Sequence, residues 1–144
     1  DVRITGSLIV DESITTNLML ANAVTGGAVF TQTSTISVGS TLVGGYFDVT
    51  YGSVKVQFIG SQNRPESNSG NFGGYYIEIY RNGTLINSLP MFYDDNFSGI
   101  VAIAAADDPG PGTHYYSIVA AVGWGASWFS FAPGGQLILD NFKR

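Results

Sequence analysis

The chain has 144 residues, a net charge of −5 and no cysteine, so it is long enough for one domain with its own core, and disulfides are excluded. Hydrophobic residues make up 44% and charged residues 12%, which excludes a disordered chain, while the acidic balance argues against nucleic-acid partners and anionic membranes. No apolar run approaches the ~20 residues that cross a bilayer, so we expect no membrane insertion. The chain begins with Asp1, and we expect it to be a piece of a longer protein.

The opening segment, residues 1–27, is apolar but too short to fold alone. A helical turn carrying Leu18, Met19 and Leu20 is far below the ~12–15 residues that survive unaided in water. Burying five or six such side chains at about 1.5–3 kcal/mol each favours self-association. The alternative is that the segment lies across the rest of the chain as an extra strand.

Residues 28–144 have the pattern of β-strands separated by turns. Residues 53–61 alternate with period two, with Val54 and Phe58 on one face, and residues 75–80 alternate in the same way. Asn82-Gly83 then provides the positive φ angles of a type I′ hairpin turn.

Two further hairpins are predicted toward the end of the chain. In the first, residues 97–123, Pro109 and Pro111 interrupt the strand pattern because proline has no amide donor. In the second, residues 127–142, the turn falls at Pro133-Gly134-Gly135. Strands at this spacing predict an all-β, jelly-roll-like or immunoglobulin-like antiparallel β-sandwich over residues 28–144.

The opening segment resembles a pattern of tailed-bacteriophage tail fibres and of the tip-attachment (host-specificity) proteins of siphophages, I-x-G-x-L-I-V-D-G-T-I-T-x-x-x-I/L-A-A-N-A-V-T. The likeness covers Ile4 to Gly26 and departs at Glu12-Ser13, in a turn, and at Leu18-Met19, where polar residues are usual. In that family three chains wind around one axis here. The resemblance implies a homotrimer with an intertwined shaft segment at 1–27, whose interface candidates are Leu8, Val10, Ile14, Leu18, Met19 and Leu20.

The rest of the chain is more loosely similar to the head domains of phage fibres. The phrases that carry this likeness are "YRNGTLI" at Tyr80 to Ile86, "DDPGPGTHYYSIVA" at Asp107 to Ala120 and "LILDNFKR" at Leu137 to Arg144. The resemblance implies a terminal head that follows the shaft segment.

We expect no catalytic residues, no metal and no cofactor. A nucleophile system would depend on the single histidine, His114, whose position after a Pro-Gly turn suits a hairpin residue better. Zinc needs nitrogen and sulfur ligands that the chain lacks. The acidic clusters 94–96 and 107–108 offer oxygen ligands for Ca²⁺ without EF-hand spacing, and solvated turns are the simpler interpretation. A pair of carboxylates for glycan hydrolysis stays open, although the chain is too short for the long β-helices of such fibres.

Two loops are candidates for recognition. Residues 60–74 form a long polar stretch with Arg64 and Phe72 as possible anchors, and Trp124 lies among glycines in residues 123–135. Tyr93, which precedes an acidic turn, could join either role. The alternative for the aromatic residues of 123–135 is the core or a subunit interface, above all for Trp128 and Phe131.

These observations leave three hypotheses on function. The first, which the resemblance favours, is a non-enzymatic receptor-binding head in the virion, at the tail tip or fibre. Exposed to the extracellular medium, it would bind a glycan or an outer-membrane protein of the host. The second is a structural trimerisation cap without receptor binding. The third is a carbohydrate-binding or glycan-cleaving module of a bacterial enzyme, which the shaft-like segment argues against.

Overall fold

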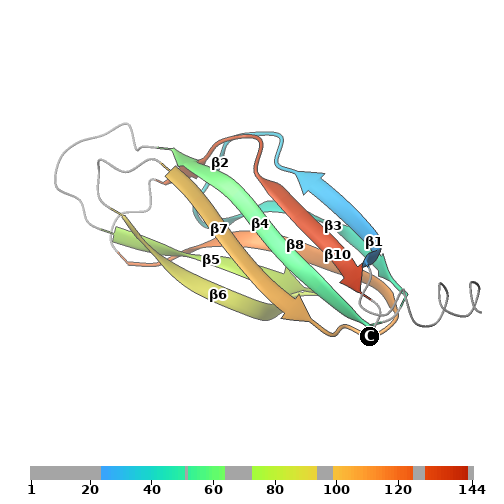
Figure 1. Ribbon diagram of the computed structural model, residues 1–144. Coiled ribbons are helices and arrows are strands. Elements are labelled where there is room, and N and C mark those ends of the chain that lie inside the picture. Colours follow the sequence, from blue (N-terminus) through green and yellow to red (C-terminus); the bar gives the residue numbers. More distant parts are fainter. Residues whose placement is uncertain (1–23, 51, 64–72, 94–98, 125–128, 143–144) are drawn as a thin grey trace, which may run out of the picture.

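A computed structural model describes residues 24–50, 52–63, 73–93, 99–124 and 129–142, and they form an all-β sandwich of two antiparallel sheets (Figure 1). The predicted fold class is thereby confirmed. Of the segment 1–27 that the sequence assigned to the shaft, residues 1–23 lie outside the described residues and residues 24–27 belong to β1. Eight strands have seven residues or more: β1 (Val24–Thr31), β3 (Ser40–Val49), β4 (Ser53–Asn63), β5 (Gly73–Arg81), β6 (Thr84–Tyr93), β7 (Gly99–Asp107), β8 (Gly112–Val122) and β10 (Gln136–Phe142). Two are short: β2 (Ile36–Ser37) and β9 (Ser130–Phe131).

The order of the long strands is that of a jelly roll. One sheet, called sheet A here, runs β1-β10-β4-β7, and the other, sheet B, runs β3-β8-β5-β6. The pairings are nested: β1 with β10, β3 with β8, β4 with β7 and β5 with β6, as if one long hairpin had been rolled up. Of the two alternatives that the sequence left open, the structure therefore selects the jelly roll.

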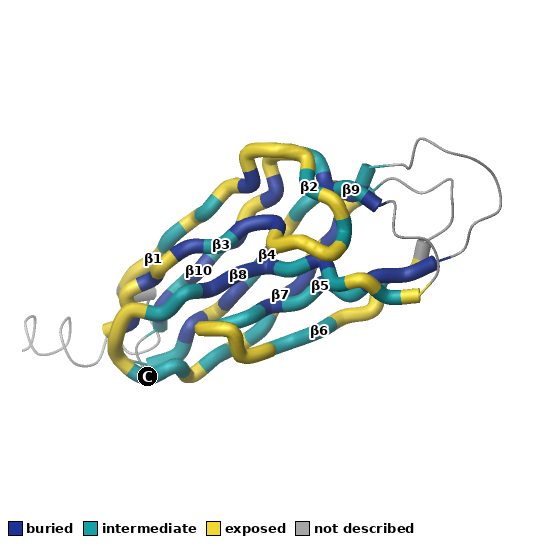
Figure 2. Tube along the Cα trace, turned by 180° about the vertical axis from the view of Figure 1, so that it is seen from behind, coloured by how far each residue is buried: buried dark blue, intermediate teal, exposed yellow. Residues whose placement is uncertain are grey.

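The core lies between the sheets and follows the predicted alternation. Val54, Val56 and Phe58 of β4 are fully buried, as are Tyr75, Ile77 and Ile79 of β5, and buried and less buried residues alternate along the strands in Figure 2. Side chains of a strand point to opposite faces in turn, so each sheet places one set inward and one outward.

Only one of the three predicted hairpins joins strands that pair with each other. Asn82 (φ 48°) and Gly83 (φ 80°) form the turn between β5 and β6, which confirms the Asn-Gly prediction. The hairpin predicted for residues 97–123 is wrong, because β7 pairs with β4 in sheet A while β8 pairs with β3 and β5 in sheet B. The proline-rich residues 108–111 therefore connect the two sheets.

The hairpin predicted around Pro133-Gly134-Gly135 is also wrong. Both β9 and β10 pair with β4, at successive positions along it. The chain therefore leaves β4 after β9 and returns to the same edge of β4 with β10. The backbone of Gln32 holds this segment: its nitrogen donates to the Gly135 carbonyl, and its carbonyl accepts from the Gly134 nitrogen. The turn residues Pro133-Gly134-Gly135 thus interrupt the pairing with β4 and do not join two strands that pair with each other.

Candidate recognition surfaces

The two ends of the sandwich differ in the length of their connections. At the end where β1 begins, called the proximal end, three connections of two to four residues join β3 to β4, β5 to β6 and β7 to β8. At the opposite, distal end, residues 64–72 join β4 to β5, 94–98 join β6 to β7, and 123–135 join β8 to β10 through β9 (Figure 1). The long connections are therefore all at the end away from Val24.

The sequence-predicted recognition residues come from these distal connections. Arg64 and Phe72 lie outside the described residues, but their neighbours Asn63 and Gly73 are at the distal ends of β4 and β5. Tyr93 ends β6, where its backbone pairs with Gly73, and its side chain is not among the described ones. Trp124 follows β8 at the same end.

Trp124 is part of an exposed aromatic group that the sequence did not predict as a unit. Its ring lies edge-on to Phe92 at 5.4 Å between centroids and to Tyr76 at 5.9 Å. Trp124 is 42% exposed and Phe92 is 77% exposed. Trp124 was a candidate recognition residue from the sequence, while Phe92 and Tyr76 were missed because outward aromatic residues look like ordinary strand residues.

Gly74 positions the Trp124 ring. The Gly74 nitrogen donates to the Trp124 carbonyl at 2.8 Å, which ties the start of β5 to the end of β8. A Cβ atom on Gly74 would meet Trp124 Cζ2 at 2.4 Å, so only glycine lets the indole lie against the backbone here. The glycine pair 73–74 was the one feature of the sequence that could have pointed to this packing.

Trp128 lies outside the described residues, but its neighbours along the chain belong to the core. Phe129 and Phe131 are buried and both contact the Tyr75 ring, with centroids 5.2 and 5.3 Å away. The core interpretation of Phe131 is therefore confirmed.

One hydrogen-bonded carboxylate of sheet B, that of Glu78, lies between the two ends. Glu78 accepts from the Tyr80 hydroxyl at 2.7 Å and from the Ser88 hydroxyl at 3.2 Å. The hydrogen bond to Glu78, with smaller effects of burial and of the carboxylate charge, raises the pKa of Tyr80. This arrangement presents hydroxyl and carboxylate oxygens side by side on the outer face.

The proximal end contains a hydrogen-bonded network around His114. Asn82 donates from Nδ2 to His114 Nδ1 at 3.1 Å, which places the ring proton on Nε2, 3.0 Å from the Gly110 carbonyl that accepts it. Both ring nitrogens of His114 therefore hydrogen-bond to the turns at this end, one to Asn82 and one to Gly110.

Asp107 connects the two sheets across the same end. Its carboxylate pairs with Arg81 at 2.6 Å and accepts from the Tyr116 hydroxyl at 2.7 Å. Arg81 and Tyr116 thus bind both oxygens of the carboxylate that a Ca²⁺ at residues 107–108 would need. The other acidic cluster, residues 94–96, lies outside the described residues. Among the described residues, no three His, Cys, Asp or Glu side chains gather in a way that could hold a metal.

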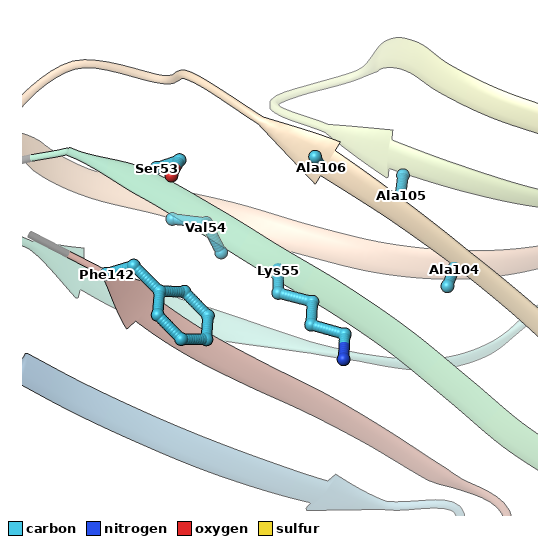
Figure 3. Close-up of a pocket in the computed structure, with 7 residues that line it drawn as sticks. All are labelled: Ser53, Val54, Lys55, Ala104, Ala105, Ala106 and Phe142. Atoms are coloured by element: carbon cyan, nitrogen blue, oxygen red, sulfur yellow. The ribbon is translucent and has the colours of Figure 1, made fainter. Parts of the chain in front are cut away.

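The outer face of sheet A is aliphatic and carries a shallow hollow of about 400 Å³ (Figure 3). The hollow lies between β7 and the ends of β4 and β10, and its walls include Lys55, Ala104, Ala106 and Phe142. Exposed Ile100 continues this face along β7 toward the distal end. In the described part of the chain, no helix has the length and apolarity needed to cross a membrane.

No protein-family model matches the sequence, and no curated protein matches it either. Among solved structures, the chain is similar to dimeric latent PorU from Porphyromonas gingivalis, at 11% identity and a TM-score of 0.59 over 86% of this chain and 13% of that one. It is also similar to a chain of the T13 IBDV viral particle, at 12% identity and a TM-score of 0.54 over 81% of this chain and 31% of that one. At such identities the likeness shows the fold alone, and the chain spans less than a third of either protein.

Proposed function

We propose that the chain is the receptor-binding head of a tailed-phage fibre or tail tip protein, that it is not an enzyme, and that it attaches the virion to the host surface as a homotrimer. The observation that carries this proposal is the asymmetry of the sandwich. The shaft-like segment leads into Val24 at the proximal end, and the long connections and the Trp124 group are at the opposite end. Loops on a rigid β-scaffold are where binding residues commonly lie.

The test is competition with phage for susceptible cells. Purified fragment should reduce phage adsorption, and the triple variant Arg64→Ala, Phe72→Ala, Trp124→Ala should lose most of this effect while staying trimeric. Thr84→Ala, which truncates an exposed residue beside the β5–β6 turn at the proximal end, is the matched control and should compete like the wild type. A native fragment that never competes would favour the structural cap, and a triple variant that competes fully would move the site elsewhere.

The proposed trimer has a candidate contact surface besides the shaft segment. The outer face of sheet A exposes Val29, Ile59 and Ile100, and it surrounds the hollow beside Phe142. Because β1 continues directly from the shaft-like segment and belongs to sheet A, we infer that this aliphatic face is turned toward the other copies. Burial of such side chains in a shared interface would stabilise the trimer.

Light scattering after dilution tests this orientation. Ile59→Asp should shift the trimer toward monomer, because it would place a carboxylate in the interface. Tyr46→Asp, which puts the same charge on the outer face of sheet B, is the control and should remain trimeric. Equal dissociation of the two variants, or of neither, would contradict the assignment of sheet A to the interface.

A further inference from the structure

The outer face of sheet B is aromatic, in contrast to the aliphatic face of sheet A. Strand alternation turns its aromatic side chains away from the core, and Figure 2 views the molecule from this side. Two of them are largely in solvent: Phe92, at 77% exposed, and Tyr46, at 72%. The outward aromatic residues of sheet B and its distal end are Tyr46, Tyr76, Tyr80, Phe92, Tyr115 and Trp124.

These aromatic residues form two groups at opposite ends of the face. The distal group is Trp124 with Phe92 and Tyr76, described above. The proximal pair is Tyr46 of β3 and Tyr115 of β8, whose ring centroids are 5.0 Å apart. Tyr115 is held over glycine in the same manner as Trp124, since a Cβ on Gly44 would meet its hydroxyl.

The distance between the groups follows from the register. Phe92 pairs with Gly74 of β5, and the Tyr115 carbonyl accepts from Asn82, which follows β5. The distal group and the proximal pair are therefore eight residues apart along β5, which is about 26 Å at ~3.3 Å per residue. Glu78, with the hydroxyls of Tyr80 and Ser88, lies between them.

The charges on the described part of this face disfavour anionic partners. Its charged residues in the described part of the chain are the carboxylates Asp48 and Glu78. Of the two described cations, Lys55 lines the hollow on sheet A and Arg81 pairs with Asp107. Phosphate or sulfate groups would meet no countercharge here, so the face suits an uncharged ligand.

We propose that the outer face of sheet B binds an uncharged, extended oligosaccharide. Sugar rings would stack on the Trp124–Phe92 group and on the Tyr46–Tyr115 pair, because aromatic rings offer an apolar surface to the C–H face of a sugar. Glu78 and Tyr80 would bind sugar hydroxyls between the two groups. Two separated aromatic groups with polar oxygens between them match a ligand that repeats its rings, whereas a protein interface gathers its aromatic residues in one buried centre.

This inference rests on the proposed function, since it names the chemical class of the receptor. The first experiment measures binding of the labelled trimer to susceptible cells treated with periodate, which cleaves sugar diols, or with protease. Binding should be lost after periodate and kept after protease. The opposite result would overturn the oligosaccharide and identify a protein receptor while leaving the receptor-binding function intact, and a trimer that binds no untreated cells would overturn both.

The second experiment tests whether the outer face of sheet B is the binding site. Calorimetry measures the binding of polysaccharide released from the same cells. Phe92→Ala should weaken binding about tenfold, as should Gly74→Ala, which keeps every aromatic ring but displaces that of Trp124. Thr84→Ala, at an exposed residue beside the β5–β6 turn, should bind like the wild type. Wild-type affinity in both Phe92→Ala and Gly74→Ala would overturn the assignment.

The length of the ligand is tested by digesting the released polysaccharide to single repeat units. Tyr46→Ala should weaken binding of the long fragments and leave that of fragments too short to reach the proximal pair unchanged. An equal effect of Tyr46→Ala on fragments of every length, or no effect on any, would overturn an extended ligand.

Discussion

Raising the pH above 10 should unfold the protein through its buried tyrosines, with Tyr75 as the test position. Tyr75 is fully buried, and burial raises the pKa of its hydroxyl above the usual 10. Burial, together with hydrogen bonding to Asp107 and the charge of that carboxylate, likewise raises the pKa of Tyr116. Above pH 10 the unfolded chain releases phenolic protons that the folded chain retains, so the free energy of unfolding decreases as the pH increases.

The magnitude follows from proton linkage. Each tyrosine that is ionised in the unfolded chain and neutral in the folded one lowers the free energy of unfolding by about 1.4 kcal/mol per pH unit. Tyr75 and Tyr116 together therefore give a limiting slope of about 2.7 kcal/mol per pH unit. This contribution to stability is fully present below pH 10 and is lost as the pH rises toward the raised values.

Tyr75→Phe separates two effects of the Tyr75 hydroxyl, which are its hydrogen bond at pH 7 and its ionisation on unfolding above pH 10. Tyr75 donates to the Gln62 side-chain oxygen at 2.7 Å, and the Gln62 amide nitrogen has no partner in the described part of the chain. At pH 7 the variant should lose about 1–3 kcal/mol, because a buried acceptor is left unpaired. Above pH 10 its limiting slope should be smaller than that of the wild type by about 1.4 kcal/mol per pH unit, so the two stability curves converge.

Urea denaturation followed by circular dichroism, at pH 7 and in steps from pH 10 to 12, measures both quantities. Gln62→Met is the control: it removes the same hydrogen bond but keeps Tyr75 buried, so it should be destabilised at pH 7 and retain the full alkaline slope. If Tyr75→Phe retained the wild-type slope, titration of Tyr75 would not be coupled to unfolding, and the reasoning would be refuted.

Three further predictions concern the turn, the proximal network and assembly. Gly83→Val should cost about 1–3 kcal/mol of stability, because a β-branched residue resists the φ of 80°, while Gly83→Asn should cost less; thermal unfolding measures both. Asp107→Asn should lose about 1–3 kcal/mol in urea denaturation, since it weakens the bonds to Arg81 and Tyr116; an unchanged midpoint would contradict this role. Light scattering should give three times the 15.3 kDa chain mass, and Leu18→Asp should dissociate or unfold that trimer; a clean monomer in the wild type would contradict it.

Local features of the sequence were sufficient for the strands and for one turn. The inward faces of β4 and β5 follow from period-two alternation, which depends only on neighbouring residues. The Asn82-Gly83 turn was predictable because its positive φ angles restrict the residue types. These parts of the fold need no knowledge of distant segments.

The pairing of strands could not be read in the same way. In the nested order, β1 pairs with β10 and β3 with β8, so the partners are far apart along the chain. Residues 108–111 have the composition of a hairpin turn, yet a turn of that composition also fits a step from one sheet to the other. Phe92 was missed for a related reason, because the Trp124 ring that it contacts follows β8, far along the chain from β6.

Under the proposed function, the nested pairing would keep attachment and recognition at opposite ends of the fold. In this antiparallel roll, each strand reverses the direction of the one before it, so alternate connections fall at opposite ends. At the proximal end, short turns are held by Asp107 and His114, which gives a fixed base where β1 begins. At the distal end, doubling the length of a loop costs only about 0.6 kcal/mol in closure entropy. Under the proposed function, changes in residues 64–72 or 94–98 would therefore alter receptor specificity while leaving the core and the base as they are.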